Sequence, residues 1–268
     1  TKKLKLSKIG SIKLKIHRNI EGKIKTCTIK KEIDKWYVCF TVEINKEIEK
    51  RVVSKSIGID VGIKSFAVLS DGQEIDNPKY LRQSEHKLIK RQRQLSKKKL
   101  GDQNKNKQRI LVAKIHKKVS NQRKDFHHKI SRELVANYDL IAFEDLNIKG
   151  MVRNHHLAKS ISDAGWGQFI GFIKYKAEEA GIWAIPVTPS GTSIECSVCG
   201  QSVKKTLADR IHECSFCNTI LDRDHNAAIN IKNRAFQTVR NEPLWRDSVV
   251  ILPNEARSPL PKGASSSQ

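Results

Sequence analysis

Two Cys-x-x-Cys pairs near the C-terminal end are the strongest constraint on how this chain of 268 residues folds. The first pair is Cys196 and Cys199, the second is Cys214 and Cys217, and residues 200–213 separate them. Each pair presents two sulfurs on one tight turn, and four thiolates satisfy the tetrahedral coordination of Zn²⁺. Because cysteine fills all four positions, the pattern predicts a structural zinc ribbon over residues 190–221 with no open position for a substrate.

The charge of the chain is the second constraint. Its 51 Lys and Arg against 28 Asp and Glu give a formal net charge of +23, which predicts a polyanionic partner, with nucleic acid as the first candidate. No stretch approaches the roughly 20 consecutive apolar residues of a membrane span, so we expect no membrane partner. No secretory signal is visible. Since only Cys27 and Cys39 lie outside the two pairs, we expect a reducing, cytoplasmic compartment and no disulfide scaffold.

Residues 1–54 are predicted to form a small β-rich unit with a basic face. Residues 11–17 and 35–44 alternate with period two, which is typical of strands. Its basic face either contacts nucleic acid or is merely solvated, and the sequence leaves both readings open. The side chains expected to face a core are Trp36, Val38, Phe40, Val42 and Ile44, and those expected to face outward are Lys13, Lys15 and His17.

Residues 55–70 predict two strands joined by a glycine-containing turn, with a hairpin turn to a third strand after them. Asp60 lies inside the first of these apolar strands, where a carboxylate is costly unless it is paired or holds a metal. The flanking Gly58 and Gly62 leave room for another backbone or a ligand to approach. The alternative is an aspartate of a turn at the strand end.

Residues 79–136 predict a basic helical hairpin with its turn at 101–106. Only Asp102 and Asp125 oppose a dense set of lysines and arginines between residues 86 and 132. Such a density of like charge disfavours a helix without a counter-charge, so the hairpin is expected to bind phosphate, a solvated face being the alternative. The residues expected to bind nucleic acid are Lys90, Arg91, Lys97, Lys98, Lys99, Arg123 and Lys124.

A second strand-borne acid follows the hairpin. Residues 139–145 predict a buried strand that carries Glu144, while the neighbouring Asp145 would point to the opposite side and share no metal with it. A helix over 164–181 is expected to bury its aromatic side chains in the core and to end at its last glycine. Another strand is predicted over 183–187.

The alternation of strands and helices over 55–235 predicts an α/β sheet that carries two inserts, the basic hairpin and the zinc ribbon. Asp60, Glu144 and either Asp222 or Asp224 would converge at one edge of this sheet. Three gathered carboxylates repel one another, and divalent cations such as Mg²⁺ or Mn²⁺ remove that repulsion. Two such ions about 4 Å apart support phosphodiester hydrolysis.

Four motifs in a fixed order carry a family resemblance over nearly all of 11–235: Gly58-Ile59-Asp60-Val61-Gly62, then Phe143-Glu144-Asp145-Leu146, then the double Cys-x-x-Cys, then Asp222 through Ile231. The chain resembles the TnpB (OrfB) proteins of bacterial and archaeal insertion sequences. That resemblance implies a nuclease domain of the RuvC, RNase H-like type, similar to the nuclease domain of type V CRISPR effectors. It implies that Asp60, Glu144 and Asp224 are the catalytic, magnesium-binding acids, with Asp222 as the second candidate for the third position.

The resemblance further implies a transposon-associated, RNA-guided DNA endonuclease, whose guide RNA derives from the transposon end and reads the target DNA by base pairing. Residues 1–54 look like the latter part of the family's wedge domain, and 236–268 are expected to be a mostly disordered tail. We expect the cytoplasm of a bacterial or archaeal cell, with association to the nucleoid when DNA is bound.

Full-length members of the family carry an opening part of the wedge and a helical recognition segment before anything like residue 11, and these are absent here. This difference leaves two other interpretations open. One is a truncated or decayed guided nucleic-acid-binding protein that does not cleave. The other is an unguided RuvC-like DNA nuclease acting on branched or single-stranded DNA.

Overall fold

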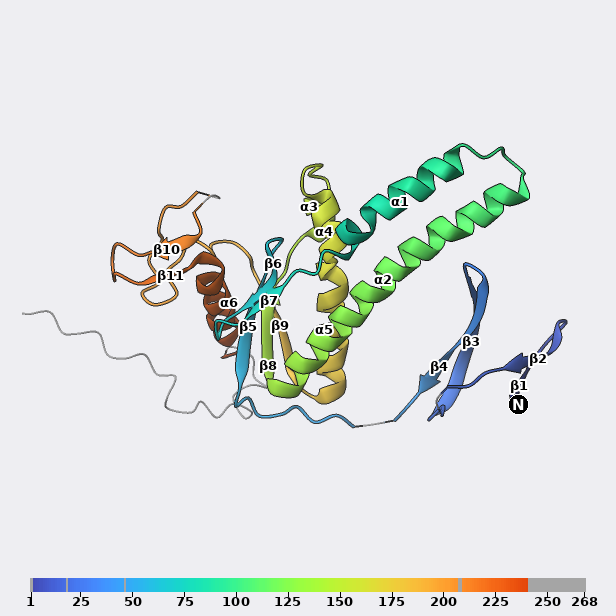
Figure 1. The fold of residues 1–268 in the computed structure, drawn as a ribbon. Coiled ribbons are helices and arrows are strands. Elements are labelled where there is room, and N and C mark those ends of the chain that lie inside the picture. Colours follow the sequence, from blue (N-terminus) through green and yellow to red (C-terminus); the bar gives the residue numbers. More distant parts are fainter. Residues whose placement is uncertain (1, 18, 46, 207–208, 241–268) are drawn as a thin grey trace, which may run out of the picture.

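A mixed five-stranded sheet lies at the centre of the computed structural model, which describes residues 2–17, 19–45, 47–206 and 209–240 (Figure 1). The strand order is β7-β6-β5-β8-β9. The first three strands along the chain pair antiparallel, whereas β8 is parallel to β5 and β9 is parallel to β8. The strands are β5 (Ser56–Val61), β6 (Ser65–Leu69), β7 (Glu74–Asp76), β8 (Leu140–Glu144) and β9 (Trp183–Val187).

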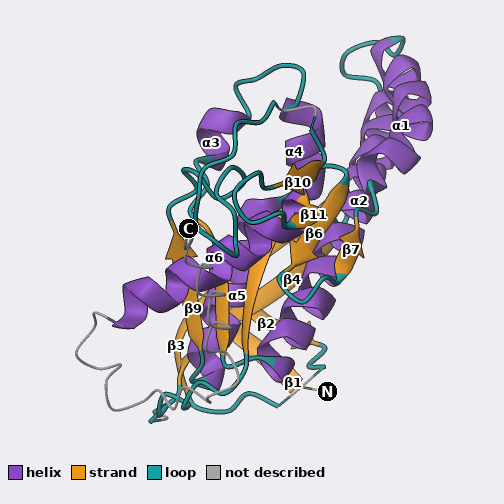
Figure 2. Cartoon of the chain, turned by 90° about the vertical axis from the view of Figure 1, so that its left-hand side faces the viewer, coloured by secondary structure: helices purple, strands orange, loops and turns teal. Residues whose placement is uncertain are grey.

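Helices cover both faces of this sheet, and the period of two along each strand decides which side chain meets which helix. Ile141 and Phe143 of β8 join the larger core with helix α5 (Trp166–Ala180), whereas Leu140 and Ala142 join a second core with helix α6 (Arg223–Arg240). Helix α6 lies across the face that Figure 2 turns toward the viewer. The predicted α/β class with a mixed sheet is therefore confirmed.

The basic hairpin between β7 and β8 consists of α1 (Tyr80–Ser96) and α2 (Gln103–Asn137) and projects away from the sheet (Figure 1). Its turn is earlier than expected: the predicted turn at 101–106 is wrong, because α2 begins at Gln103. The cause is Asp102, whose carboxylate accepts a hydrogen bond from the Asn104 backbone N–H at 2.9 Å and so caps the helix. Leu88 of α1 and Val119 of α2 are buried.

The N-terminal unit consists of two separate antiparallel hairpins, and the core face predicted for 35–44 is wrong. Trp36 is 67% exposed and Ile44 is 60% exposed, while the side chains between them line an open groove of about 960 Å³. A two-stranded sheet has too little surface to bury one of its faces. The strands are β1 (Lys2–Leu6), β2 (Gly10–Leu14), β3 (Lys23–Glu32) and β4 (Lys35–Glu43), and Lys13, Lys15 and His17 are exposed as predicted.

Two ion pairs join the β3–β4 turn to α2. Lys117 Nζ lies 2.5 Å from Glu32, and Lys114 Nζ lies 2.7 Å from Asp34. The side-chain hydrogen bonds that Glu32 accepts from Lys117 and Lys30 lower its pKa to about 2. Two of the positive charges of α2 are therefore paired with carboxylates of the hairpin formed by β3 and β4.

Short helices α3 (Ile148–Met151) and α4 (Ala158–Ala164) precede α5, whose Trp166 and Phe169 lie in the core as predicted. Helix α5 ends at Gly181, which has a φ of +70°. Residues 236–240 were expected to belong to the tail but continue α6, and 241–268 lie outside the described residues. Within the described part of the chain, no helix combines the length and apolar character needed to span a membrane.

Candidate active site and metal centre

Asp60 faces α6 because of its place on β5. Gly58 lies two residues before Asp60, on the same face of the strand. A Cβ atom at Gly58 would lie 2.1 Å from the Ala228 carbonyl oxygen and 2.7 Å from the Lys232 backbone nitrogen. The backbone that was expected to approach Gly58 is therefore that of α6. Since side chains two apart on a strand share a face, Asp60 points to the side where α6 begins.

Glu144 reaches the same side from the neighbouring strand. It follows Leu140 and Ala142 with period two, and both of these pack against α6. The parallel register of β5 and β8 pairs Ile59 with Phe143, so Asp60 and Glu144 are the next residues of adjacent strands. Asp145 is exposed, whereas Glu144 is partly buried.

The third acid comes from the start of α6, which directly follows β11 (Ile220–Asp222). Asp222 Oδ1 accepts hydrogen bonds from the backbone N–H groups of Asp224 at 2.8 Å and His225 at 3.1 Å. Asp222 is thereby engaged in capping the helix. The Asp224 carboxylate instead accepts a bond from Arg223 Nε at 3.0 Å and lies 3.9 Å from Arg210. Of the two, Asp224 has the larger effect on Asp60, whose pKa the charges of both raise.

Electrostatics link the three carboxylates. Burial, followed by the charges of Glu144 and Asp224, raises the pKa of Asp60 well above its ordinary value, and Arg223 opposes the shift. Burial also raises the pKa of Glu144, although a hydrogen bond from Thr192 and the charge of Arg234 act to lower it. A divalent cation would reduce the repulsion among these three carboxylates. Their oxygen atoms are the donors expected of a Mg²⁺ or Mn²⁺ site.

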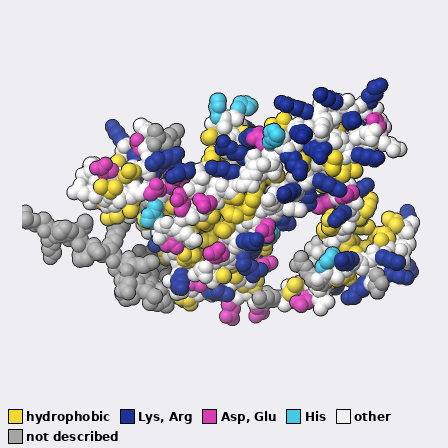
Figure 3. All heavy atoms as spheres, viewed as in Figure 1, with side chains coloured by type: hydrophobic (Ala, Val, Ile, Leu, Met, Phe, Trp, Pro, Cys, Tyr) yellow, Lys and Arg dark blue, Asp and Glu magenta, His cyan; other side chains and the backbone are white. Residues whose placement is uncertain are grey.

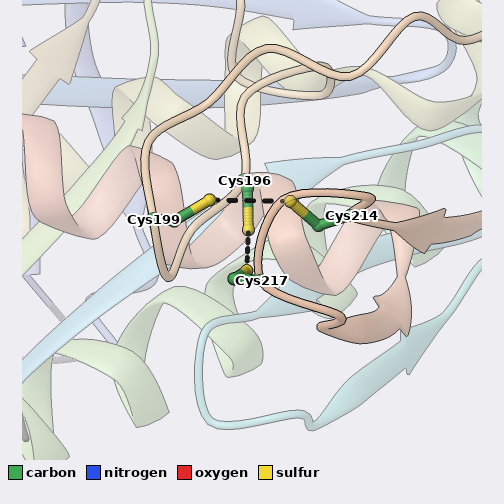
Figure 4. Close-up of side chains that lie close together, drawn as sticks. All are labelled: Cys196, Cys199, Cys214 and Cys217. Carbon is green, nitrogen blue, oxygen red and sulfur yellow. Dashed lines mark hydrogen bonds between the residues drawn. The ribbon is translucent and has the colours of Figure 1, made fainter. Parts of the chain in front are cut away.

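The four cysteines form a compact cluster with their sulfurs pointing toward one another (Figure 4). The Sγ atoms of Cys196 and Cys217 are 3.6 Å apart, and those of Cys199 and Cys214 are 3.5 Å apart. A tetrahedral zinc site with Zn–S bonds of about 2.3 Å separates its sulfurs by about 3.8 Å, so the cluster fits this ion. Among the residues that the structure describes, this tetrad is the sole group of three or more possible ligands whose donor atoms all lie within 4.8 Å of one another; the three acids are spaced more widely.

His212 is the histidine that lies between the two cysteine pairs in the sequence. It is the middle residue of β10 (Ile211–Glu213), which pairs with β11, and it is fully buried. Its Nδ1 is in contact with Lys205 Nζ, and among the described residues its Nε2 finds no hydrogen-bond partner. The alternation of the strand turns this side chain inward, and His212 is not part of the cysteine group.

The basic residues predicted to bind nucleic acid fall into two groups. Lysine and arginine side chains gather along the hairpin of α1 and α2 (Figure 3). Arg91 donates to Gln94 at 3.1 Å, and Arg123 donates to the Ser162 carbonyl oxygen at 2.9 Å, so both make contacts within the protein. The exposed members are Lys90, Lys97, Lys98, Lys99 and Lys124.

Three polar residues beside the acids were missed from the sequence. Thr192 donates from its hydroxyl to Glu144 Oε1 at 2.6 Å, and the buried Asn226 and Asn230 donate to backbone carbonyls of the loop around Thr192. The two asparagines stand four residues apart in the final motif, which places them on one helix face. This spacing was the one sign in the sequence that the two asparagines act together.

Comparison with known proteins gives two family matches. Residues 39–155 match the OrfB family of IS605, described as "Probable transposase", and residues 166–231 match the TNB domain of Cas12f1-like proteins. A relative from Streptomyces pristinaespiralis, named as an RNA-guided DNA endonuclease, is 34% identical over 74% of this chain and 49% of its own length. The protein named RNA-guided DNA endonuclease InsQ of Escherichia coli K12 is 27% identical over 84% of this chain and 60% of its own length.

Among solved structures, a Cas12f1 chain in complex with sgRNA and target DNA superimposes with a TM-score of 0.50 at 21% identity, covering 76% of this chain and 55% of that chain. At this identity the likeness concerns the fold alone. The chain spans about half to three fifths of the length of the relatives it matches.

Proposed function

Because the chain is TnpB-like, with the OrfB match at 39–155 and the TNB match at 166–231, we propose that it is a transposon-associated, RNA-guided DNA endonuclease with a RuvC-type, RNase H-like nuclease domain. The observation that carries this proposal is the convergence of Asp60, Glu144 and Asp224 on the α6 side of one sheet. In this proposal, residues 55–235 are the nuclease domain, the basic hairpin and zinc ribbon are inserts, and 1–54 are part of a wedge domain.

The three carboxylates are the residues that would hold Mg²⁺ or Mn²⁺, since the charges of Glu144 and Asp224 both act on Asp60. When bound, such ions activate a water and stabilise the oxygen that leaves phosphorus. The chain's own contribution is to fix where the acids stand: β5 and β8 hold Asp60 and Glu144 side by side, and the cap of α6 presents Asp224. Hydrolysis forms a bond between the water oxygen and phosphorus and breaks the bond between phosphorus and the leaving oxygen. One proton of the water goes to that leaving oxygen, which becomes a hydroxyl, and the new oxygen stays on the phosphate.

The zinc ribbon acts as structure in this proposal. The backbone N–H of Gln201 lowers the pKa of the Cys199 thiol, but burial and the three neighbouring sulfurs outweigh it and raise that pKa to about 12. Sulfurs this close cannot all ionise without a cation among them. A Zn²⁺ ion satisfies all four thiolates and leaves no coordination position for substrate.

The partners we propose are a guide RNA from the transposon end and a target DNA, in the cytoplasm of a bacterial or archaeal cell. The exposed lysines at the tip of the hairpin, Lys97, Lys98 and Lys99, would contact the phosphates of the guide or of its heteroduplex. Arg91 and Arg123 would support the hairpin rather than contact phosphate, since both already bond within the protein.

The test is cleavage of labelled duplex DNA in Mg²⁺ with a matching guide RNA, a guide of scrambled target sequence, and no RNA. We expect cutting only with the matching guide. Equal cutting in all three reactions would contradict guidance and favour an unguided nuclease.

A second candidate is a guided nucleic-acid-binding protein that does not cleave. The exposed lysines at the tip of the hairpin, Lys97, Lys98 and Lys99, fit it equally well, since they would bind phosphate whether or not the acids cleave. Guide-dependent DNA binding without any metal-dependent product would support it.

A further inference from the structure

Thr192 lies in the loop that leads from β9 to the first cysteine pair, and it makes a short hydrogen bond to Glu144, one of the predicted catalytic acids. Its Oγ1 is 2.6 Å from Glu144 Oε1 and 3.0 Å from the Pro189 carbonyl oxygen. A hydroxyl has one proton, so these acceptors compete for it, and the shorter contact has the length of a charge-assisted bond to a carboxylate. Thr192 is only 3% exposed, so water competes little for this hydroxyl.

Helix α6 fixes the loop that carries Thr192. Asn230 Nδ2 donates to the Thr192 carbonyl oxygen at 2.9 Å and to the Glu195 carbonyl oxygen at 2.7 Å. One turn earlier, Asn226 Nδ2 donates to the same Glu195 carbonyl at 2.8 Å, and Asn226 Oδ1 accepts from the Ser197 backbone N–H at 2.9 Å. Both amides are buried, so these bonds are costly to break.

The loop has little freedom to take another path. Gly191 has a φ of +83°, and a Cβ there would lie 2.7 Å from Glu195 Oε1. The other oxygen of Glu195 accepts from Arg234 at 2.7 Å. Thr192 is therefore held at its backbone by α6 and by a neighbouring turn that only glycine fits.

We propose that Thr192 is a positioning residue that holds the Glu144 carboxylate in the orientation needed to bind the divalent cation. Oε1 is held by the hydroxyl, which fixes where Oε2 points. Asp224 belongs to α6. Glu144 belongs to β8 but is linked to α6 through Thr192, whose backbone is held by Asn230. One helix therefore aligns two of the three acids. The first cysteine of the tetrad, Cys196, follows four residues later, so this same loop joins the cysteine cluster to the acids.

This inference rests on the proposed function, so its test includes a readout that does not require cleavage. The first measurement is Mn²⁺ binding to the zinc-loaded chain by calorimetry, with Asp60→Ala defining the part that belongs to the acids. We expect Thr192→Val, which removes the hydroxyl at nearly constant volume, to weaken that binding about 10- to 100-fold, the usual effect of removing a group that orients a metal ligand. Thr192→Ser, which keeps the hydroxyl, should stay close to the wild type.

The matched control is Thr206→Val. Thr206 belongs to the same insert and its hydroxyl bonds Asp209 at 3.0 Å, away from the acids, so its removal should leave Mn²⁺ binding unchanged. Asn230→Ala should weaken Mn²⁺ binding in the same direction as Thr192→Val, because it releases the loop from α6. Melting temperatures of all variants separate altered metal binding from unfolding.

Wild-type Mn²⁺ affinity in Thr192→Val would overturn the assignment. So would an equal decrease in the serine and valine variants, since packing and not the hydroxyl would then be responsible. The proposed function is tested separately from the role of Thr192. A wild-type chain that binds Mn²⁺ at Asp60 but does not cut guided DNA would contradict the nuclease. The valine and serine variants would still decide the role of Thr192.

Discussion

Replacing Gly58 with alanine tests the packing that brings the acids together. The new Cβ would lie 2.1 Å from the Ala228 carbonyl oxygen and 2.7 Å from the Lys232 nitrogen, and both atoms belong to the backbone of α6. A backbone cannot rotate away as a side chain can, so α6 must move off β5. Overpacking a core costs about 1–3 kcal/mol, and we expect a value at or above the top of that range here.

Gly171 supplies the matched control. It lies in the interior of α5, and a Cβ there would meet nothing within 4 Å. Alanine in a helix interior is more favourable than glycine by about 1 kcal/mol, so Gly171→Ala should stabilise the protein by about that amount. The same glycine-to-alanine change thus has opposite expected signs at the two positions.

Thermal unfolding, followed by circular dichroism, measures both effects. For a domain of 150–250 residues, 1 kcal/mol shifts the melting temperature by about 2–4 °C. We expect Gly58→Ala to lower it by about 6–12 °C, which corresponds to about 3 kcal/mol, and Gly171→Ala to raise it by about 2–4 °C. A Gly58→Ala variant as stable as the wild type would refute the direct packing of α6 on β5, and with it the placement of Asp224 beside Asp60.

Three further expectations concern the metal, the charge and the buried histidine. Cys196→Ser should lower both zinc content and melting temperature, because folding and metal binding are coupled; unchanged values would contradict a structural zinc site. Replacing Lys97, Lys98 and Lys99 with alanine should reduce the salt dependence of duplex binding, which fluorescence anisotropy measures. The slope of log affinity against log salt concentration should fall by about 0.9 for each phosphate that the protein no longer neutralises. An unchanged slope would mean that these lysines are only solvated. Burial lowers the pKa of His127 to about 4, below its ordinary 6.5, so the unfolded chain takes up a proton first as pH falls. Stability from this group is therefore complete above about pH 6.5 and gone by about pH 4, a change on the order of 3 kcal/mol that His127→Gln should remove from the pH dependence of urea unfolding; the same dependence in both proteins would contradict it.

The centre of the sheet was predictable because β6, β8 and the middle of β5 are buried and read as apolar runs. The sequence predicted that Asp60 and Glu144 converge at one edge of the sheet, and the glycine at position 58 indicated a close approach of another backbone or a ligand. The register of β5 and β8 came only from the structure. The cysteine spacing predicted the tetrad for a similar reason, since a tight turn fixes each pair of sulfurs.

The errors have physical causes that a local pattern does not contain. Alternation at 35–44 predicts a strand correctly but not what covers it, and β4 has a half-open face because its sheet has only two strands. The burial of His212 depends on β11 and Lys205, which the spacing of cysteines does not reveal. Thr192 reaches Glu144 across 48 residues of chain, so only the folded arrangement shows its bond to the acid.

The most direct test of the acid site is guided DNA cleavage by the Asp60→Ala variant in Mg²⁺, compared with the wild type and with Asp145→Ala. Asp145 is a matched acid because it adjoins Glu144 in sequence but is exposed. We predict that Asp60→Ala abolishes cleavage while guide and DNA binding stay nearly unchanged, and that Asp145→Ala still cuts. Full cleavage by Asp60→Ala would contradict the assignment of the three acids.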